Sequence, residues 1–579
     1  MRRNVFMPIH NSEIANIFYD VAAFLEIEGA NPFRIRAYRG AARTLSSLSG
    51  SVVDRIAQGH DLTEIPGIGR DLAHKIEIIV ETGSLPMLKE LESRLPPGLK
   101  DIMRLSGVGP KKAAALYKEL GIKNLEGLKK AAESGRIREL RNFGAKIEAN
   151  ILEEVSRGRK EGEGRTLLIK AEEYAEPLCR HLQKSKGVKK VVPAGSYRRR
   201  QETVGDLDIL VTCKKGSNVM NDFTGYDDVR KVVSQGKTRS TVILRSGLQV
   251  DLRVVPEVSY GAALHYFTGS KPHSIAIRKI GLNKSYKINE YGVFKKDKRI
   301  AGRTEEEVYE TVGLPYIEPE LREDRGEIKE AQQGILPELI RLEDLQGDLH
   351  THTDETDGRD TLEEMAQAAQ ERGYSYLAVT DHSRQVSVAK GLDEDRLLEQ
   401  IDAIDKLNDS LKGLTLLKGI EVDILKDGSL DLPDRVLKRL DIRVCSVHSY
   451  FKLSAKEQTE RILRAMDNPL FNVLGHPSGR LIQSREAYDL DMERIMEGAK
   501  ERGCFLELNS QPDRMDLRDV HLKRAREIGV LISISTDAHW SKNLDWIRFG
   551  VDQARRGWLS SADVINTRDL AELRKLLKR

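Results

Sequence analysis

The pattern of apolar and polar positions changes twice along the chain. The first part is helical in pattern, with helices expected at Arg70–Val80 and Lys111–Leu120, and it ends in a charged, glycine-rich stretch at residues 157–164, which predicts a linker. Short β-like runs follow, at Val188–Pro193, Asp206–Thr212, Thr241–Arg245 and Leu248–Val255. The pattern thus predicts a helical region followed by a region built on a sheet.

A polar stretch at Glu320–Glu330 predicts a second linker, and strands and helices alternate regularly after residue 346. This alternation is the pattern of parallel βα units, so the chain is expected to end in a (β/α)7 barrel. The expected barrel strands are Gly347–His352, Tyr376–His382, Thr415–Asp423, Asp441–His448, Asn472–His476, Cys504–Asn509 and Leu531–Asp537.

Length and composition indicate a large multidomain protein. At about 150 residues per domain, 579 residues predict several domains, each able to bury its own core. No apolar run approaches the roughly 18–20 residues that span a bilayer, so no membrane association is expected. The four cysteines form no CxxC pair, which favours a reducing cytoplasm and disfavours a thiolate zinc site.

Charge is unevenly distributed along the chain. Residues 1–346 carry 58 Lys and Arg against 48 Asp and Glu, a net charge of +10. Residues 347–579 carry 36 against 42, a net charge of −6. A basic front joined to an acidic back indicates that the front binds a polyanion such as a nucleic acid.

Two glycine motifs precede the expected helices of the basic front. They are IPGIG at residues 65–69 and LSGVGP at 105–110, with a weaker third copy, LRNFG, at 140–144. Glycines allow a tight turn that leaves backbone N–H groups available at a helix N-terminus, where a phosphate can bind. One copy alone would indicate an ordinary corner between helices, but repetition in a basic region favours phosphate binding.

A set of carboxylates marks the sheet region. GSYRR at residues 195–199 is followed by GDLDILV at 205–211, so Asp206 and Asp208 lie at i and i+2 on a strand and share a face. Asp251 lies on another expected strand. Brought together, the three carboxylates could hold two Mg²⁺ ions, which activate a 3′-hydroxyl and stabilise a leaving pyrophosphate. Taken alone, DLD would indicate only solvated acids at a strand end.

Metal-ligating residue types gather at the ends of the expected barrel strands. Six of the seven histidines after residue 346 fall at or near such ends, and His350 and His352 share a face. In βα barrels the C-terminal ends of the strands carry the active site. Imidazoles with carboxylates suit Zn²⁺, Mn²⁺ or Fe²⁺, which could activate water for attack on a phosphodiester. A lone histidine is usually a core residue, so the clustering is what indicates metals.

The glycine motifs resemble helix-hairpin-helix DNA-backbone binders, and residues 1–320 resemble family X DNA polymerases of the DNA polymerase beta type. YFTGS at 266–270 and INEY at 288–291 match this family's nucleotide-binding subdomain. The resemblance implies that Asp206 and Asp208 hold both metals and that Asp251 also accepts the primer hydroxyl's proton. It implies contacts to the incoming nucleotide or the template from Gly195, Ser196, Arg199, Gly205, Tyr266, Phe267, Gly269 and Arg278. It also implies a monovalent cation at the hairpins, whose matching positions are Thr63, Ile65, Gly67, Ile68 and Gly69, then Met103, Leu105, Gly107, Val108 and Gly109.

Two departures from the family pattern stand out. Ser274 occupies a position where the family usually has an asparagine that reaches the minor-groove edge of the base. In the region resembling the deoxyribose-phosphate lyase subdomain, Lys75 matches the Schiff-base lysine and Arg34 could hold a 5′-phosphate. A second family lysine is replaced by Asp71, which could pair with Lys75 and oppose its nucleophilicity. Lys75 could equally be an ordinary lysine on a helix surface.

The barrel region resembles the PHP (polymerase and histidinol phosphatase) domain. The resemblance implies a phosphoesterase with up to three Mn²⁺, Zn²⁺ or Fe²⁺ ions, and in polymerase-linked relatives a 3′–5′ exonuclease, sometimes with abasic-site endonuclease activity. All nine family ligand positions are occupied, by His350, His352, Asp357, His382, Glu421, His448, His476, Asp537 and His539.

The order of these resemblances is that of the bacterial and archaeal PolX family. It implies a polymerase that fills short gaps in base excision repair, acting on gapped or nicked DNA with deoxynucleoside triphosphates. A cytoplasmic, nucleoid-associated monomer is expected. The expected domains are 1–90 (lyase-like, helix-hairpin-helix), 91–160 (second helix-hairpin-helix), 161–262 (palm), 263–322 (nucleotide-binding, thumb-like), 323–345 (linker) and 346–579 (PHP).

Three alternatives stay open at this point. The PHP domain could be only a metal-stabilised scaffold, or the whole chain a non-catalytic module that binds DNA ends. A small-molecule phosphatase such as a histidinol phosphatase would explain the back of the chain but not its basic front.

Overall fold

The computed structural model of the chain describes residues 9, 11–46, 52–65, 67–96, 98–103, 105, 108–140, 143–144, 147–149, 151–152, 155 and 164–578. The chain divides into two compact units. One consists of Met1–Gly164 with Gly225–Val233 and Val242–Gln249, and the other of Arg165–Thr224, Ser234–Thr241 and Val250–Arg579. Residues 157–163 of the first expected linker lie outside the described residues.

The N-terminal region is helical, as its pattern predicts. Both expected helices form, and each ends where a glycine, Gly83 or Gly121, adopts a left-handed conformation that breaks the helix. Helix α4 buries Leu72, Ile76 and Ile79, which are spaced along one face. The helices are α1 (Asn11–Glu28), α2 (Pro32–Ser46), α3 (Val52–Ala57), α4 (Arg70–Thr82), α5 (Pro86–Arg94), α6 (Leu99–Met103), α7 (Pro110–Leu120) and α8 (Leu125–Glu133).

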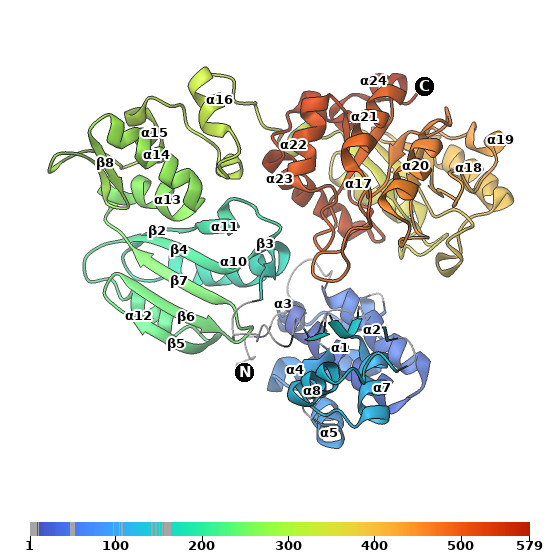
Figure 1. The fold of residues 1–579 in the computed structure, drawn as a ribbon, viewed down its shortest axis with the longest axis horizontal. Helices are drawn as coiled ribbons and strands as arrows, with labels where there is room; N and C mark the ends of the chain where they lie inside the picture. Colours follow the sequence, from blue (N-terminus) through green and yellow to red (C-terminus); the bar gives the residue numbers. More distant parts are fainter. Residues whose placement is uncertain are drawn as a thin grey trace. The chain divides into compact units, whose positions relative to one another are not determined.

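A five-stranded sheet follows, with the order β2–β4–β7–β6–β5. Figure 1 shows its strands side by side, and α10 (Leu168–Gln183) lies against β2. Four expected strands are confirmed to within two residues, but the apolar pattern does not predict β5, because nearly all its side chains are exposed. The strands are β2 (Val188–Pro193), β4 (Asp206–Cys213), β5 (Val229–Gln235), β6 (Arg239–Leu244) and β7 (Gln249–Val254).

A smaller α/β region completes this part of the chain. Its three strands pair antiparallel in the order β10–β9–β8. Its elements are α13 (Tyr260–Thr268), α14 (Lys271–Asn283), β8 (Tyr286–Asn289), β9 (Gly292–Lys295), β10 (Lys298–Ala301) and α15 (Glu305–Val312).

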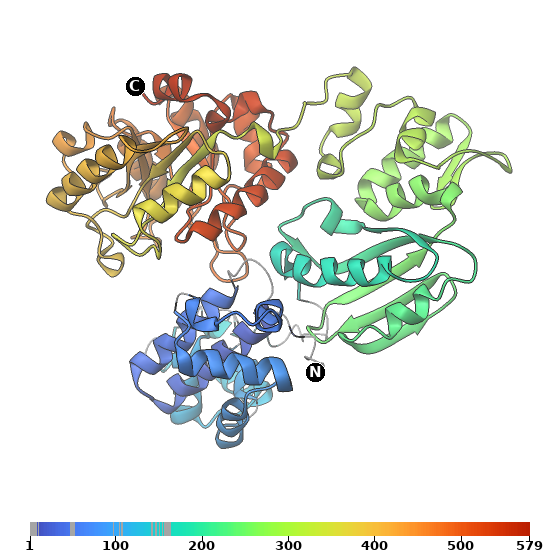
Figure 2. The ribbon, with the colours of Figure 1, turned by 180° about the vertical axis from the view of Figure 1, so that it is seen from behind.

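The C-terminal region is a seven-stranded parallel barrel, which confirms the expected architecture. The strands lie in chain order, and helices surround them in both views of the ribbon (Figures 1 and 2). The strands are β11 (Gly347–Thr351), β12 (Tyr376–Val379), β13 (Thr415–Asp423), β14 (Ile442–Ser446), β15 (Val473–Leu474), β16 (Phe505–Asn509) and β17 (Ile532–Ser535). The helices are α17 (Leu362–Glu371), α18 (Glu394–Asn408), α19 (Asp434–Leu437), α20 (Ala455–Met466), α21 (Met492–Arg502), α22 (Asp519–Ile528), α23 (Ile547–Arg556) and α24 (Leu570–Leu576).

The barrel closes between its first and last strands mainly through side chains. One parallel bridge, Thr351 to Ala538, joins the β11 side to the β17 side. The buried side chain of Asn566 donates to the carbonyls of Gly347 and Ile534, each at 2.8 Å, and accepts from the Ile534 N–H at 3.0 Å. Asn566 therefore takes the place of a strand-to-strand ladder across this seam.

The segment expected to be the second linker, Glu320–Glu330, is folded and partly buried. Residues 320–330 contain the end of a 3-10 turn (Pro319–Leu321) and the start of α16 (Glu327–Gln333), and Arg322 and Glu327 are fully buried. Arg322 donates to Glu305 at 2.6 Å and to the Ile317 carbonyl at 2.8 Å. The polar residues pair with one another instead of with water, which composition alone does not reveal.

No described helix combines the length and the apolar character that crossing a membrane requires.

Candidate functional sites

The three expected carboxylates of the sheet region stand on neighbouring strands and interact electrostatically. Asp206 and Asp208 stand on β4 and Asp251 on the next strand of the sheet, β7. Burial and then the charges of Asp206 and Asp251 together raise the pKa of Asp208 to about 7. Burial and then Asp251 also raise the pKa of Asp206. Such mutual repulsion is what a cluster built to hold cations shows when no cation is present.

Hydrogen bonds fix the third carboxylate. Asp251 Oδ1 accepts from the Thr241 hydroxyl at 2.6 Å and from Arg239 Nη2 at 3.2 Å. Asp251 is buried, so these donors offset part of its loss of hydration.

Gly195 brings the GSYRR turn against the carboxylates. Its φ is +60°, and a Cβ added there would lie 2.7 Å from Asp208 Oδ2. Only glycine lets the backbone of α11 (Gly195–Arg198) approach the acid this closely. Ser196 begins the same short helix, and Gly205 immediately precedes β4.

Arg199 follows this turn and is held on two sides. Its Nε donates to Glu323 at 3.0 Å and its Nη1 to the Thr268 carbonyl at 2.5 Å. The positive charge of Arg199 lowers the pKa of Asp208 against the effect of burial, which places the guanidinium near the carboxylates. A Cβ on Gly269 would lie 3.3 Å from Nη1, so the expected nucleotide residues Arg199 and Gly269 adjoin each other.

The expected aromatic pair lies at the end of α13. The rings of Tyr266 and Phe267 are 5.0 Å apart in a T-shaped arrangement, with Arg253 over Phe267 at 4.3 Å and Arg278 over Tyr266 at 5.9 Å. Ser274 is buried, and its hydroxyl has no hydrogen-bond partner within the described residues.

An equivalent backbone hydrogen bond spans each hairpin turn. The Ile68 N–H donates to the Ile65 carbonyl at 2.9 Å, and the Val108 N–H donates to the Leu105 carbonyl at 3.0 Å. Gly69 and Gly109 then occupy the N-cap positions of α4 and α7. Thr63 lies in the 3-10 turn before the first hairpin, and Met103 ends α6 before the second. Gly67 has a φ of +80°, whereas Gly107 lies outside the described residues.

Lys75 pairs with Asp71, as the sequence predicts. The ammonium is largely shielded from solvent and also lies 5.9 Å from the centre of the Tyr38 ring. Arg34 is exposed, and its Nη2 contacts the Met87 sulfur at 3.5 Å. A free nucleophilic amine is therefore not what this structure presents.

The nine expected barrel ligands converge at the C-terminal ends of the strands. Three groups place their ligand atoms within 4.8 Å of one another. They are His352, Asp357, His382 and His539; His350, His352 and Asp537; and His382, Glu421 and His448. His476 joins the last group through Glu421, with Nε2 to Oε1 at 2.9 Å.

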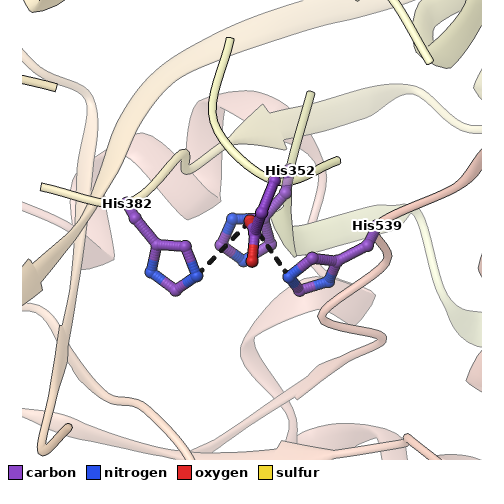
Figure 3. A group of neighbouring side chains, drawn as sticks. His352, His382 and His539 are labelled. Atoms are coloured by element: carbon purple, nitrogen blue, oxygen red, sulfur yellow. Dashed lines mark ion pairs between the residues drawn. The ribbon is translucent and has the colours of Figure 1, made fainter. Parts of the chain in front are cut away.

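Figure 3 shows the first group. The rings of His352, His382 and His539 turn toward a common centre, where the Asp357 carboxylate lies 3.6 Å from His382 and 3.3 Å from His539. His350 Nε2 lies 3.6 Å from Glu421 and 3.7 Å from Asp537 and has no hydrogen-bond partner among the described residues. With metal–ligand bonds of about 2.0–2.2 Å, two ligands of one ion lie about 3–4 Å apart, so this donor set fits metal ions.

Electrostatics indicate the same use of the barrel site. Burial acts to lower the pKa of His350, but Glu507, Asp537 and Glu421 outweigh it and raise that pKa well above its usual range. The pKa of His382 is likewise raised, to about 11, mainly by Glu421 against burial. Without metals these imidazoles keep protons that metal binding would displace.

The sequence analysis missed the carboxylates that hold the ligands from behind. Glu507 accepts from His350 Nδ1 at 2.6 Å, and Asp423 lies 3.2 Å from His448 Nδ1. Asp423 follows Glu421 by two residues on one strand, so the sequence could have predicted that both side chains lie on the same face. Asp381, which adjoins His382 at a strand end, instead binds Thr353, Thr356 and Gln400 and has a structural role.

Five family models match successive parts of the chain. They are a helix-hairpin-helix domain (residues 9–85), a SAM-like helix-hairpin-helix tandem (99–157), the DNA polymerase beta palm (170–260), the DNA polymerase beta thumb (263–323) and the PHP domain (348–511).

Three similar proteins illustrate the range of the comparison. A probable phosphatase of Thermoanaerobacter sp. (strain X514) is 30% identical over 242 residues, which cover 40% of this chain and 94% of that protein. A crystal structure of Leishmania infantum polymerase beta, a ternary P/T complex, is 22% identical with a TM-score of 0.26 and covers 39% of this chain and 99% of that one.

The third comparison extends over the whole chain. The DNA polymerase/3′-5′ exonuclease PolX of Bacillus subtilis (strain 168) is 37% identical over 575 residues, which cover 99% of this chain and 100% of that protein. With the polymerase beta and PHP models matched in the same order, the chain belongs to the PolX family.

Proposed function

We propose that this protein is a DNA polymerase that fills short gaps in DNA and carries a 3′–5′ exonuclease in its PHP barrel. The observation that carries the polymerase is the placing of Asp206, Asp208 and Asp251 on neighbouring strands, with the GSYRR turn packed against Asp208. The barrel's three overlapping ligand groups carry the nuclease. The B. subtilis relative's name, which joins the same two activities, supports both assignments.

In the polymerase site, Asp206, Asp208 and Asp251 would hold two Mg²⁺ or Mn²⁺ ions. Bound there, such ions supply the charge that activates the primer 3′-hydroxyl and stabilises the leaving pyrophosphate. Asp251, oriented by Thr241 and Arg239, accepts the proton of that hydroxyl. Arg199 binds the triphosphate through charge-assisted hydrogen bonds, together with Gly195, Ser196 and Gly205.

On the other side of the nucleotide, the backbone at Tyr266 and Phe267 crowds the 2′ position of the sugar, which favours deoxynucleotides. Gly269 lies beneath the base pair, and Arg278 contacts the template strand. Ser274 occupies the position from which an asparagine usually reaches the edge of the base, and its shorter hydroxyl has no hydrogen-bond partner among the described residues.

In the barrel, the nine ligands would hold up to three Mn²⁺, Zn²⁺ or Fe²⁺ ions. Bound there, such ions supply a nucleophilic water near neutral pH and neutralise charge on the phosphodiester. Glu507 and Asp423 hold His350 and His448 in the orientations that present their other ring nitrogens to the ligand groups.

The hairpins would hold the DNA backbone and a monovalent cation on either side of a gap. Release of a deoxyribose phosphate by Lys75 stays a prediction of the sequence, because Asp71 pairs with its ammonium.

One experiment tests both activities. Purified protein is incubated with a gapped duplex and Mn²⁺, with and without deoxynucleotides, and extension is resolved from degradation on a sequencing gel. We expect extension by the length of the gap when nucleotides are present and shortening from the 3′ end when they are absent. Extension without shortening would mean that the barrel is only a scaffold. The absence of both extension and shortening would overturn the proposal.

A further inference from the structure

A compact ion-pair network joins the expected triphosphate arginine to the PHP barrel. Glu323 Oε1 accepts from Arg199 Nε, from Gln201 Nε2 at 2.9 Å and from Arg556 Nη1, with both arginine contacts at 3.0 Å. Arg556 belongs to barrel helix α23, and its side chain is 4% exposed. A barrel residue thus shares one carboxylate oxygen with an arginine of the polymerase region.

Arg556 also grips the backbone of Arg199. The same Nη1 donates to the Arg199 carbonyl at 2.7 Å, while Nη2 donates to Asp519 at 2.6 Å. Asp519 begins barrel helix α22 and is buried, so it anchors Arg556 in the barrel. Arg556 therefore restrains Arg199 at its main chain directly and at its side chain through Glu323.

The bonding of Arg199 leaves one edge for a ligand. Its Nε binds Glu323 and its Nη1 binds the Thr268 carbonyl, whereas Nη2 has no hydrogen-bond acceptor in the part of the chain that the structure describes. Two fixed edges and one available edge hold a guanidinium in a single orientation, which lowers the entropy cost of binding a phosphate.

We propose that Arg556 and Glu323 are positioning residues for nucleotide binding, so that the PHP barrel helps to build the triphosphate site of the polymerase. The proposal rests on the function proposed above, in which Arg199 binds the triphosphate. It gives the barrel a part in polymerisation that does not depend on its metal ligands.

The test compares Arg556→Gln with a matched control, Arg548→Gln. Arg548 lies on the same helix and pairs with Glu172 of α10 at 2.9 Å, so its loss also removes an ion pair between the barrel and the sheet region. Arg548 makes no hydrogen bond or ion pair with Arg199 or Glu323 among the described residues. Gap filling by the full-length protein is measured as a function of deoxynucleotide concentration.

We expect Arg556→Gln to raise KM for the deoxynucleotide about tenfold, the effect of one charge-assisted contact, and to change kcat by less than about threefold. The inhibition constant of inorganic tripolyphosphate should rise by a similar factor, because the change acts on phosphate binding. The Kd for gapped DNA should stay unchanged. A folding defect or a general loosening of the barrel would not produce this split.

The network makes a second requirement. Because Glu323 and Arg556 act on the same arginine, the double variant Glu323→Ala/Arg556→Gln should raise KM by less than the product of the two single effects. Multiplying effects, an unchanged KM in Arg556→Gln, or an equal rise in Arg548→Gln would each overturn the proposal.

Failure of the underlying function gives a different result. If the wild-type protein adds no nucleotide, or if Arg199→Ala leaves KM and tripolyphosphate inhibition unchanged, the assignment of the polymerase site is wrong and this inference falls with it. A large effect of Arg199→Ala with none of Arg556→Gln would reject the inference alone.

Discussion

Gly195 and Asp208 show how narrowly the polymerase site is fitted. A single methyl group on Gly195 would reach within 2.7 Å of Asp208 Oδ2, so the turn and the acid cannot shift independently. Burial and the neighbouring acids together raise the pKa of Asp208 to about 7. The clustered carboxylates therefore repel one another when they are ionised, and bound cations would relieve that repulsion.

The first prediction concerns these acids. Asp206→Ala or Asp208→Ala should abolish nucleotide addition while changing the Kd for gapped DNA by less than about threefold, because basic and backbone groups hold the phosphates. Primer extension and fluorescence anisotropy on the same preparation measure the two effects. Extension at near wild-type rates by either folded variant would reject the assignment.

The second prediction concerns Glu305, which pairs with Arg198 and Arg322. Burial opposes its ionisation, but Arg322 and Arg198 outweigh burial and depress its pKa from 4.5 to about 2. A depressed pKa contributes stability that is fully present above pH 4.5 and is lost as the pH falls toward 2. The contribution is about 3 kcal/mol.

Glu305→Gln should therefore lower the free energy of unfolding at pH 7 by about that amount. The difference from the wild type should shrink as the pH falls below 4.5. Urea unfolding at several pH values measures it. A difference that stayed constant down to acidic pH would show that the charge of Glu305 is not what stabilises this contact.

At the scale of elements, the first hairpin presents backbone N–H groups at the start of α4, with Arg34 exposed on α2. Arg39, a second candidate for a phosphate ligand, is engaged in an ion pair with Glu26. A phosphate pocket at this hairpin would therefore depend on Arg34 and not on Arg39.

The third prediction follows. The protein should bind a gapped duplex with a 5′-phosphate about tenfold more tightly than one without it, and both affinities should fall as salt rises. Arg34→Ala should remove most of that preference. Arg36→Ala deletes an equal charge from the same helix, where Arg36 stacks on the Phe33 ring 4.6 Å away, and should leave the preference intact. Equal affinity for the two duplexes would mean that this hairpin does not form a pocket for the 5′-phosphate.

Which elements the sequence predicts depends on burial. The barrel strands alternate with helices along the chain and are buried nearly throughout, so their apolar runs are visible in the sequence and all seven are predicted. Strand β5 exposes nearly all its side chains and carries no such signal. The segment at 320–330 is polar, yet Arg322 and Glu327 are buried, because Arg322 pairs with Glu305 and Glu327 lies 2.6 Å from His273. Charges that pair with residues far away in the sequence leave no local pattern.

The candidate sites divide in the same way. Ligands at strand ends are predictable, since strand position and residue type are both local. Glu323 and Arg556 are separated by more than two hundred residues in the chain, and only the folded structure brings them to Arg199.

At the scale of the whole molecule, the polymerase carboxylates and the barrel ligands stand on different sheets. The fourth prediction is that His350→Ala or Asp537→Ala removes 3′–5′ exonuclease activity by about a hundredfold or more and spares gap filling. The two ligands come from opposite ends of the barrel's strand order, so the loss of either opens a ligand group.

The matched control is His521→Ala. His521 lies on α22, belongs to none of the ligand groups, and is half-buried. It should retain both activities. Gap filling and circular dichroism of the same preparations establish that the variants are folded, because metals also stabilise folded sites. Undiminished degradation of 3′ ends by a folded His350→Ala protein would mean that the barrel is not the nuclease.

The seam between β11 and β17 is the junction at which the barrel closes. Other neighbouring strands of the barrel are joined by backbone ladders, whereas this pair shares one bridge. Side chains make the remaining contacts: Asn566 bonds across the seam, Thr536 contacts Asp348, and His350 and Asp537 belong to the same ligand group. Metal bound by residues from both sides would stabilise this junction.

Chelation should therefore speed hydrogen–deuterium exchange in β11 and β17 more than in β14, which shares a five-residue ladder with β13. Equal exchange across all seven strands would mean that the barrel stands closed by its scaffold alone. Faster exchange in β11 and β17 would instead mean that the metal ligands also close the barrel that surrounds them, so that metal binding and barrel closure are a single event.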